Sequence, residues 1–234
     1  MFNKDATNFL ALINKVTNSL ILKYPRTVAM SEDQDIRMIF DISELDPEQF
    51  DDIGLKDSLD SFLKLSNLFP EDRSISIDAN TINISHDKLQ SAFITDNLAL
   101  MDAYDKDEDQ FTKTEGVPSV ASFVITPDDI DKISKACGVF KDLSEIMFTS
   151  QDSDMIISLG ASNRFNARSN KFSITKSANT SKEFELKIPV ENFQKLPSSE
   201  YTIDVKYNQN KDSYRILLTS KSFESFKILM SVKA

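Results

Sequence analysis

The sequence contains few of the residue types that build reactive sites. In 234 residues it has one cysteine, one histidine and four glycines. Cys137 cannot form an internal disulfide, and its place on the apolar side of a predicted helix indicates a core residue. His86 lies in a predicted turn and has no second histidine with which to build a zinc site. The glycines form neither a phosphate loop nor a dinucleotide fingerprint. We therefore expect no metal, no cofactor and no enzymatic activity.

The sequence also lacks membrane and export signals. Its N-terminus has no cationic and apolar segment of the secretory type, and no apolar run approaches the ~20 residues that cross a bilayer. We expect a soluble, folded protein without membrane contact, in the cytoplasm, or in the host cell cytoplasm if the protein is viral.

Positive charge is in deficit, because the formal net charge at pH 7 is -10. A simple nucleic-acid binder would instead carry a dominating positive field. Any contact with DNA therefore requires that the lysines be gathered on one surface.

An acidic stretch without hydrophobic periodicity divides the chain. It covers residues 96–119 and ends near Gly116 and Pro118, which is typical of an exposed connector. We therefore expect an N-terminal domain of residues 1–95, this connector, and a C-terminal domain of residues 120–234.

A calcium loop is the alternative interpretation of the connector. Asp105, Asp107 and Asp109 have the appropriate spacing for it. Gln110, however, occupies the position that requires glycine, and Gly116 the position of the bidentate glutamate. A solvated connector is the better explanation.

Each half of the chain combines amphipathic helices with alternating strands. Helical spacing predicts helices over residues 5–18 and 127–142, the second capped by Thr126. A third helix begins near Asp57 or Ser58, and a very short one occupies residues 190–196 before Pro197. Strand patterns such as 36–42, 74–79 and 201–205 lie between them. These patterns predict an α+β fold of two similar domains, each with helices packed on antiparallel sheets.

The order of helix, strands, short helix and strands occurs in both halves, which indicates an internal repeat. Short helices must pack on sheets to be stable, so their polar faces would form one continuous surface. Lysines and asparagines on that surface suit sequence-independent contact with phosphates. A solvated helix face is the alternative for the same residues. The candidate DNA-facing residues are Lys4, Asn8, Lys15, Asn18, Lys64, Lys132, Lys135 and Lys195.

The whole chain resembles DNA polymerase sliding clamps, in particular those of T-even-like bacteriophages. The segments that carry the resemblance are DATNFLALINKVTNSLILK, SFLKLSNLF, VITPDDIDKI and IPVENFQKLPSSEYTIDV. The resemblance implies a homotrimeric ring of the clamp fold, with helices lining a hole for double-stranded DNA. It also implies an ATP-driven clamp loader that opens the ring and a DNA polymerase that the ring tethers for processive synthesis.

The resemblance further implies two kinds of contact site. The last strand of domain 1 would pair with an edge strand of a neighbour, so the expected subunit interface contains Lys88, Gln90, Ala92, Arg164, Asn166 and Arg168. Partner peptides would dock in an apolar pocket near the connector, whose expected lining residues are Leu45, Leu98, Leu100, Met101 and Phe111.

Two alternatives belong to other functional classes. One is a hydrolase or transferase on a repeated α+β scaffold. Its candidate acids, the pairs Asp51 with Asp52 and Asp128 with Asp129, are explained by turns and helix N-termini. The other is a non-enzymatic structural or virion protein that assembles through its sheets without DNA.

Overall fold

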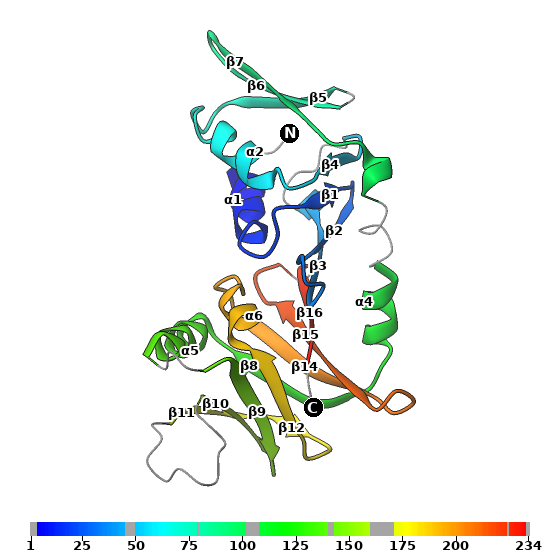
Figure 1. Ribbon diagram of the computed structural model, residues 1–234, viewed down its shortest axis with the longest axis vertical. Coiled ribbons are helices and arrows are strands. Elements are labelled where there is room, and N and C mark those ends of the chain that lie inside the picture. The colour runs from blue at the N-terminus through cyan, green and yellow to red at the C-terminus, as the bar shows by residue number, and fades with distance from the viewer. Residues whose placement is uncertain are drawn as a thin grey trace. The chain divides into compact units, whose positions relative to one another are not determined.

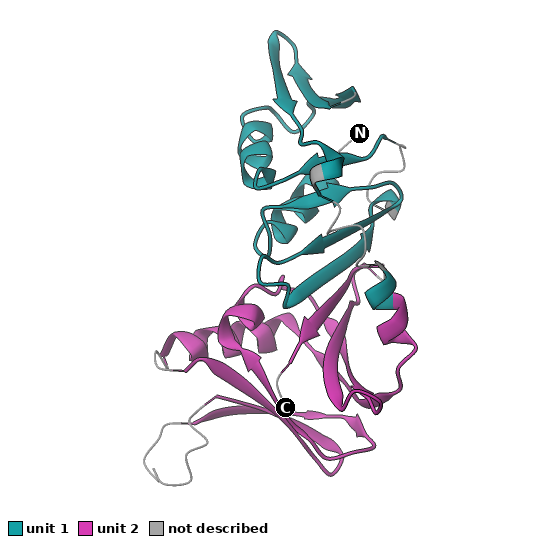
Figure 2. Ribbon diagram, turned by 45° about the vertical axis from the view of Figure 1, so that its right-hand side comes forward, with its two compact units in different colours: residues 1–111 teal, residues 112–234 magenta. Residues whose placement is uncertain are grey.

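The computed structural model describes residues 4–44, 50–78, 80–101, 108–139, 143–159, 171–223 and 225–232. Two compact units make up the chain, Met1–Phe111 and Thr112–Ala234 (Figure 2). The boundary between them falls inside the expected connector.

The first unit combines two helices with two antiparallel sheets in its described part (Figure 1). Its sheets have the strand orders β3-β2-β1-β4 and β5-β6-β7. The elements in chain order are α1 (Lys4–Ile13), β1 (Leu20–Leu22), β2 (Arg26–Met30), β3 (Ile36–Asp41), the 3-10 turn η1 (Ile42–Glu44), β4 (Ile53–Leu55), α2 (Leu59–Ser66), β5 (Ser74–Asp78), β6 (Thr81–His86), β7 (Leu89–Ile94) and the 3-10 turn η2 (Leu98–Leu100). Helix α4 (Glu108–Glu115) follows and crosses the boundary between the units.

Aromatic side chains join the helices of this unit to its sheets. Phe9 of α1 meets Phe40 of β3 with ring centroids 4.8 Å apart, and Phe62 of α2 meets Phe93 of β7 at 5.8 Å. Both pairs have the edge-to-face geometry that aromatic rings prefer. The apolar faces of α1 and α2 therefore cover different sheets of the unit.

The second unit has the same alternation of helices and antiparallel sheets. Its sheets contain the strand orders β12-β8-β14-β15-β16 and β11-β10-β9-β13. The elements in chain order are β8 (Ser119–Ile125), α5 (Pro127–Val139), β9 (Glu145–Gln151), β10 (Asp154–Leu159), β11 (Phe172–Ser177), β12 (Asn179–Thr180), β13 (Glu185–Pro189), α6 (Val190–Gln194), β14 (Tyr201–Asn208), β15 (Ser213–Ser220) and β16 (Lys227–Ser231).

The core of the second unit is built by strands that bury every second residue, as β9 and β10 do. Phe123 of β8 and Phe148 of β9 join the two sheets at a centroid distance of 6.0 Å. Phe193 fixes the one-turn helix α6 because its side chain is fully buried. The hydroxyl of buried Tyr201 donates to the carbonyl oxygen of Pro197 at 2.9 Å, which fixes the turn into β14.

The structure corrects two of the predicted elements. Helix α1 ends at Ile13 and not near Asn18, because the hydrogen bonds of residues 15–17 form a turn after the helix that leads the chain into β1. The connector is not exposed throughout, since α4 lies within it and buries Phe111 and Thr114 on one face. These two residues are three apart, so they share one side of the helix. The predicted start of α5 at Pro127 is confirmed.

Candidate nucleic-acid interface

The exposed side of α5 carries four charged residues in one stripe. Asp128, Asp131, Lys132 and Lys135 are all exposed, while Ile130, Ile133 and Cys137 on the other side are buried. The four charged positions follow the spacing of three and four residues that places side chains on one helix face. The stripe begins acidic and ends basic, which complements the helix dipole.

Each lysine of this stripe forms an ion pair with the aspartate one turn before it. Lys132 Nζ lies 2.5 Å from Asp128 Oδ2, and Lys135 Nζ lies 2.6 Å from Asp131 Oδ2. The hydrogen bond to its aspartate raises the pKa of each of these lysines above the usual range. Both ammonium groups are therefore charged at neutral pH, and both already have a carboxylate partner.

Helix α2 repeats this arrangement. Lys64 Nζ lies 2.6 Å from Asp60 Oδ2, again four residues apart, and both side chains are exposed. Lysine and aspartate thus occur in matched positions on helices of both units. The four-residue spacing between each aspartate and its lysine is visible in the sequence. An interpretation based on the lysines alone overlooks these acidic partners.

The N-terminus of α5 is fixed by a capping box that extends to an edge strand. Asp129 accepts hydrogen bonds from the backbone N–H and the hydroxyl of Thr126, and its own N–H donates to Thr126 Oγ1. Lys176 of β11 binds the same carboxylate at 2.6 Å. Burial would raise the pKa of Asp129, but the bonds from Lys176 and Thr126 outweigh it and lower the pKa below its usual value of 3.8.

The remaining candidate DNA-facing residues have varied surroundings. Asn8 and Lys15 are exposed, and Lys195 is half-buried just after α6. Asn18 has a structural role, because its amide oxygen accepts the backbone N–H of Asp60 at 2.7 Å. It thereby caps α2 in place of the predicted cap residue Ser58, whose side chain makes no capping bond. The side chain of Lys4 lies outside the described part of the structure.

Two free sheet edges are candidates for the subunit interface. In the described residues, β7 is the outer strand of β5-β6-β7, and β11 is the outer strand of its sheet in the second unit. Gln90 and Ala92 lie in β7, and Lys88 lies in the turn before it. Arg164, Asn166 and Arg168 lie outside the described residues.

The register shows which backbone groups of β7 are free. In the β6–β7 hairpin, a two-residue turn follows His86, and Thr95 N–H donates to Asn80 O. These two features determine which facing residues are hydrogen-bonded to each other. Residues 89, 91 and 93 are bonded to β6. Gln90, Ala92 and Ile94 direct their N–H and C=O groups outward, and Ile94 is 79% exposed. The outer edge of β7 is therefore available for pairing with another strand.

The expected peptide pocket is closed at two of the three predicted residues whose side chains the structure describes. Met101 and Phe111 are buried, with 1% and 2% of their surface exposed. Leu98 is half-buried at the start of η2. Leu45 and the side chain of Leu100 lie outside the described part of the chain. An open pocket at Met101 or Phe111 would require these side chains to move.

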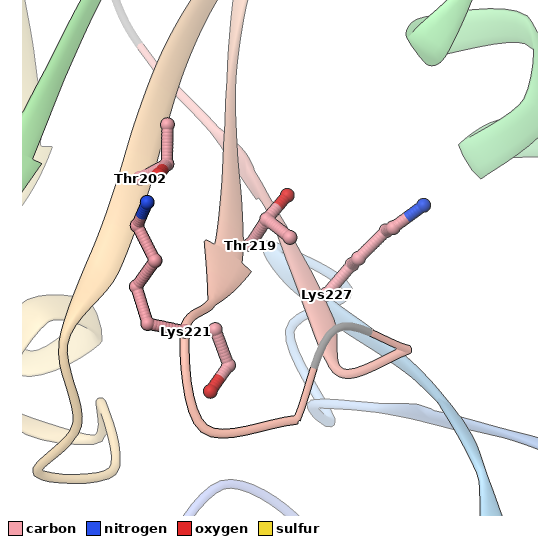
Figure 3. A pocket seen from close by; sticks show the side chains of 5 residues that line it. Thr202, Thr219, Lys221 and Lys227 are labelled. Atoms are coloured by element: carbon pink, nitrogen blue, oxygen red, sulfur yellow. The ribbon is translucent and has the colours of Figure 1, made fainter.

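The second unit has a polar hollow of about 420 Å³ on its larger sheet. Thr202, Thr219, Lys221 and Lys227 line it, together with Ser220 (Figure 3). Lys221 extends toward Thr202, whereas Lys227 points away toward α4 and binds Glu115 Oε1 at 2.5 Å. Lys227 is thus used to hold the end of α4.

The described residues also bear on the metal and membrane expectations. Among them, no group of three or more His, Cys, Asp or Glu side chains is placed to hold a metal ion. Asp105 and Asp107 of the rejected calcium loop lie outside these residues. No described helix is both long enough and apolar enough to cross a bilayer.

Comparison with known proteins gives matches in structure but not in sequence. No protein-family model and no curated protein sequence matches the chain. The PCNA of A. fulgidus, in a structure with the C-terminal region of FEN-1, matches with a TM-score of 0.66 at 12% identity, over 97% of this chain and 94% of that one. The PCNA of Entamoeba histolytica matches with the same TM-score and coverage at 8% identity.

Bacterial beta clamps match as well, over part of their length. A putative DNA polymerase III beta subunit of Eubacterium rectale gives a TM-score of 0.65 at 12% identity, covering 97% of this chain and 63% of that one. The Helicobacter pylori beta clamp, in a structure with a DNA ligase peptide, gives 0.62 at 14%, over 97% and 62%. The chain thus spans less than two thirds of these bacterial subunits. Two similar units of helices on antiparallel sheets, matched over nearly the whole chain, give this protein the DNA sliding-clamp fold.

Proposed function

We propose that this protein is a DNA sliding clamp of the T-even-like bacteriophage type. Three copies close into a ring around double-stranded DNA, and the ring tethers a DNA polymerase for processive synthesis. An ATP-dependent clamp loader opens the ring, and the clamp itself catalyses no reaction. The observation that carries this proposal is the match of 97% of the chain to clamps of two different subunit sizes.

The two compact units of the chain support a ring of three. The chain has two compact units and covers 94% of the PCNA chains but only 63% of the Eubacterium rectale subunit. The clamps that the sequence resembles close their ring with three chains of two similar domains each, and this chain has two such units. Contacts between unlike surfaces generate a closed ring when the rotation between subunits closes.

The free edges provide the two unlike surfaces. We propose that β7 of one subunit pairs with β11 of the next. On β7, Gln90, Ala92 and Ile94 present outward backbone groups; on β11 the register with β10 leaves those of Ser173 and Thr175 outward. Pairing would complete a continuous sheet across the interface and remove two exposed edges.

Partner recognition is proposed by analogy with complexes of clamps that share this fold. FEN-1 and a DNA ligase peptide are found with related clamps. In this chain, the half-buried Leu98 at the beginning of the connector is the expected entry point for a polymerase tail. Docking there would displace Met101 or Phe111 from their buried positions.

Retention on DNA tests the proposal. The loaded protein should stay on circular DNA and leave linear DNA through its ends, and it should stimulate its polymerase only with the loader. Replacing Lys132 and Lys135 by glutamate should impair loading or sliding and preserve the trimer. Retention that depends on salt alone, regardless of DNA ends, would contradict a ring. Failure to stimulate a polymerase would favour the structural assembly protein.

A further inference from the structure

The helix faces carry no excess of positive charge. Helices α1, α2, α5 and α6 together contain four lysines, no arginine and six carboxylates. One of the carboxylates, Asp129, is buried and is used to hold Lys176. Acidic side chains therefore accompany the lysines on these helices.

Three of the acidic residues are placed directly against lysines. Asp60, Asp128 and Asp131 lie within 2.5 to 2.6 Å of Lys64, Lys132 and Lys135. Exposed helix pairs of this kind contribute little to the stability of a protein. The same pairing occurs on helices of both units, so the positive charge of each of these lysines is offset at the helix surface.

We propose that Asp60, Asp128 and Asp131 weaken the contact between the helix faces and the DNA backbone. This inference rests on the proposed function, since it assumes that these faces line the hole of the clamp. The partner is the phosphate backbone of duplex DNA, and the three aspartates lower the affinity of the helix faces for it.

The physical basis is counterion release. A free lysine that binds a phosphate releases a cation condensed on the DNA, and this release drives the association. A lysine that leaves an aspartate for a phosphate also releases that cation. The abandoned carboxylate, however, becomes an unpaired negative charge beside the DNA. The free energy gained by releasing the cation is then largely cancelled, so the paired lysines attract the duplex without binding it tightly.

The test measures binding of the full-length protein to a short linear duplex over a range of salt concentrations, and it needs no loader. The test variant carries Asp60→Asn, Asp128→Asn and Asp131→Asn together. Affinity falls as the salt concentration rises. Each lysine that becomes free to bind a phosphate should make the slope of log affinity against log salt concentration steeper by about 0.9. If two lysines gain phosphates, the ratio of variant to wild-type affinity should change about 12-fold over a fourfold range of salt.

Glu145→Gln is the matched control. Glu145 also faces a lysine, Lys187 at 3.8 Å, but on a sheet position that alternates with the buried Ile146. This substitution removes one negative charge, where the triple variant removes three, and it should leave the slope unchanged. Unfolding by urea should show nearly wild-type stability for all variants, because Asp60→Asn keeps a side-chain oxygen that can accept from Asn14 Nδ2, as Asp60 Oδ1 does at 3.4 Å.

The outcomes separate the inference from the proposed function. A steeper slope for the triple variant but not for Glu145→Gln supports the inference. An unchanged slope, or an equal change in the control, overturns it, even where wild-type protein is retained on circular DNA. A steeper slope together with no retention of wild-type protein on loaded circles would overturn the sliding clamp and leave the DNA contact.

Discussion

Proline at position 92 should open the ring and leave each subunit folded. Ala92 lies in the middle of edge strand β7, and its N–H points away from β6. Proline lacks this N–H, and on an edge strand it is tolerated where the missing donor faces outward. Ala92→Pro therefore removes a donor from the proposed β7–β11 pairing and none from the hairpin.

The effect can be estimated for one interface. Loss of a backbone hydrogen bond costs about 0.5–1.5 kcal/mol, and the facing carbonyl of the neighbour, left unsatisfied when buried, adds about 1–3 kcal/mol. A total of roughly 1.5–4.5 kcal/mol corresponds to an interface about 10-fold to 2,000-fold weaker. Trimers at micromolar concentration should then dissociate.

The assay is sedimentation or light scattering over a range of protein concentrations, combined with a thermal unfolding curve. Ser91→Pro is the control, because the N–H of Ser91 faces β6 and is used inside the hairpin. That variant should lower the stability of the subunit itself. Ala92→Pro should shift mass from trimer to monomer with a nearly unchanged unfolding transition.

The reasoning is refuted if Ala92→Pro assembles as strongly as the wild type. It is also refuted if the two proline variants destabilise the subunit equally, since the outward direction of the Ala92 N–H would then be incorrect.

Three further predictions concern the second unit. Thr126→Ala should lower the free energy of unfolding by about 1 kcal/mol, measured by urea denaturation, because the capping box of α5 loses its hydroxyl; no change would show that the cap is dispensable. The depressed pKa of Asp129 means that its ionised form stabilises the fold above pH 3.8 and that this contribution is lost as the pH falls through the lower folded pKa. The stability difference between wild type and Asp129→Asn should therefore shrink in acid, and a difference that grows below pH 3.8 would contradict the assignment. Tyr201→Phe leaves the buried carbonyl of Pro197 without its hydroxyl donor and should cost about 1–3 kcal/mol in the same urea experiment; an unaltered midpoint would mean that this bond contributes nothing.

Local signals in the sequence were reliable where a few neighbouring residues define the structure. Thr126 and Pro127 marked the start of α5, and the spacing of Val190 and Phe193 marked the one-turn helix α6. In both cases the capping group or the apolar side chains lie within one turn of the helix.

Signals failed where distant residues complete the structure. Asn18 was expected on a DNA-facing helix surface, but it lies beyond the end of α1 and caps α2 across 42 positions of sequence. Helix α4 was missed because its short apolar face, with Phe111, is surrounded by charged residues. Its last turn is held by partners far along the chain: Arg215 donates to Thr114 Oγ1, and Lys227 binds Glu115.

The sequence by itself determined the alternation of helices and strands, the repeat of that order, and the scarcity of groups for catalysis or metal binding. These properties depend on residue types and on spacings of two to four positions. Only the tertiary structure decided that β7 and β11 are free edges in the described sheets, that Met101 is buried, and that Asn18 caps α2. Such features depend on contacts between residues far apart in the chain, and no local pattern specifies them.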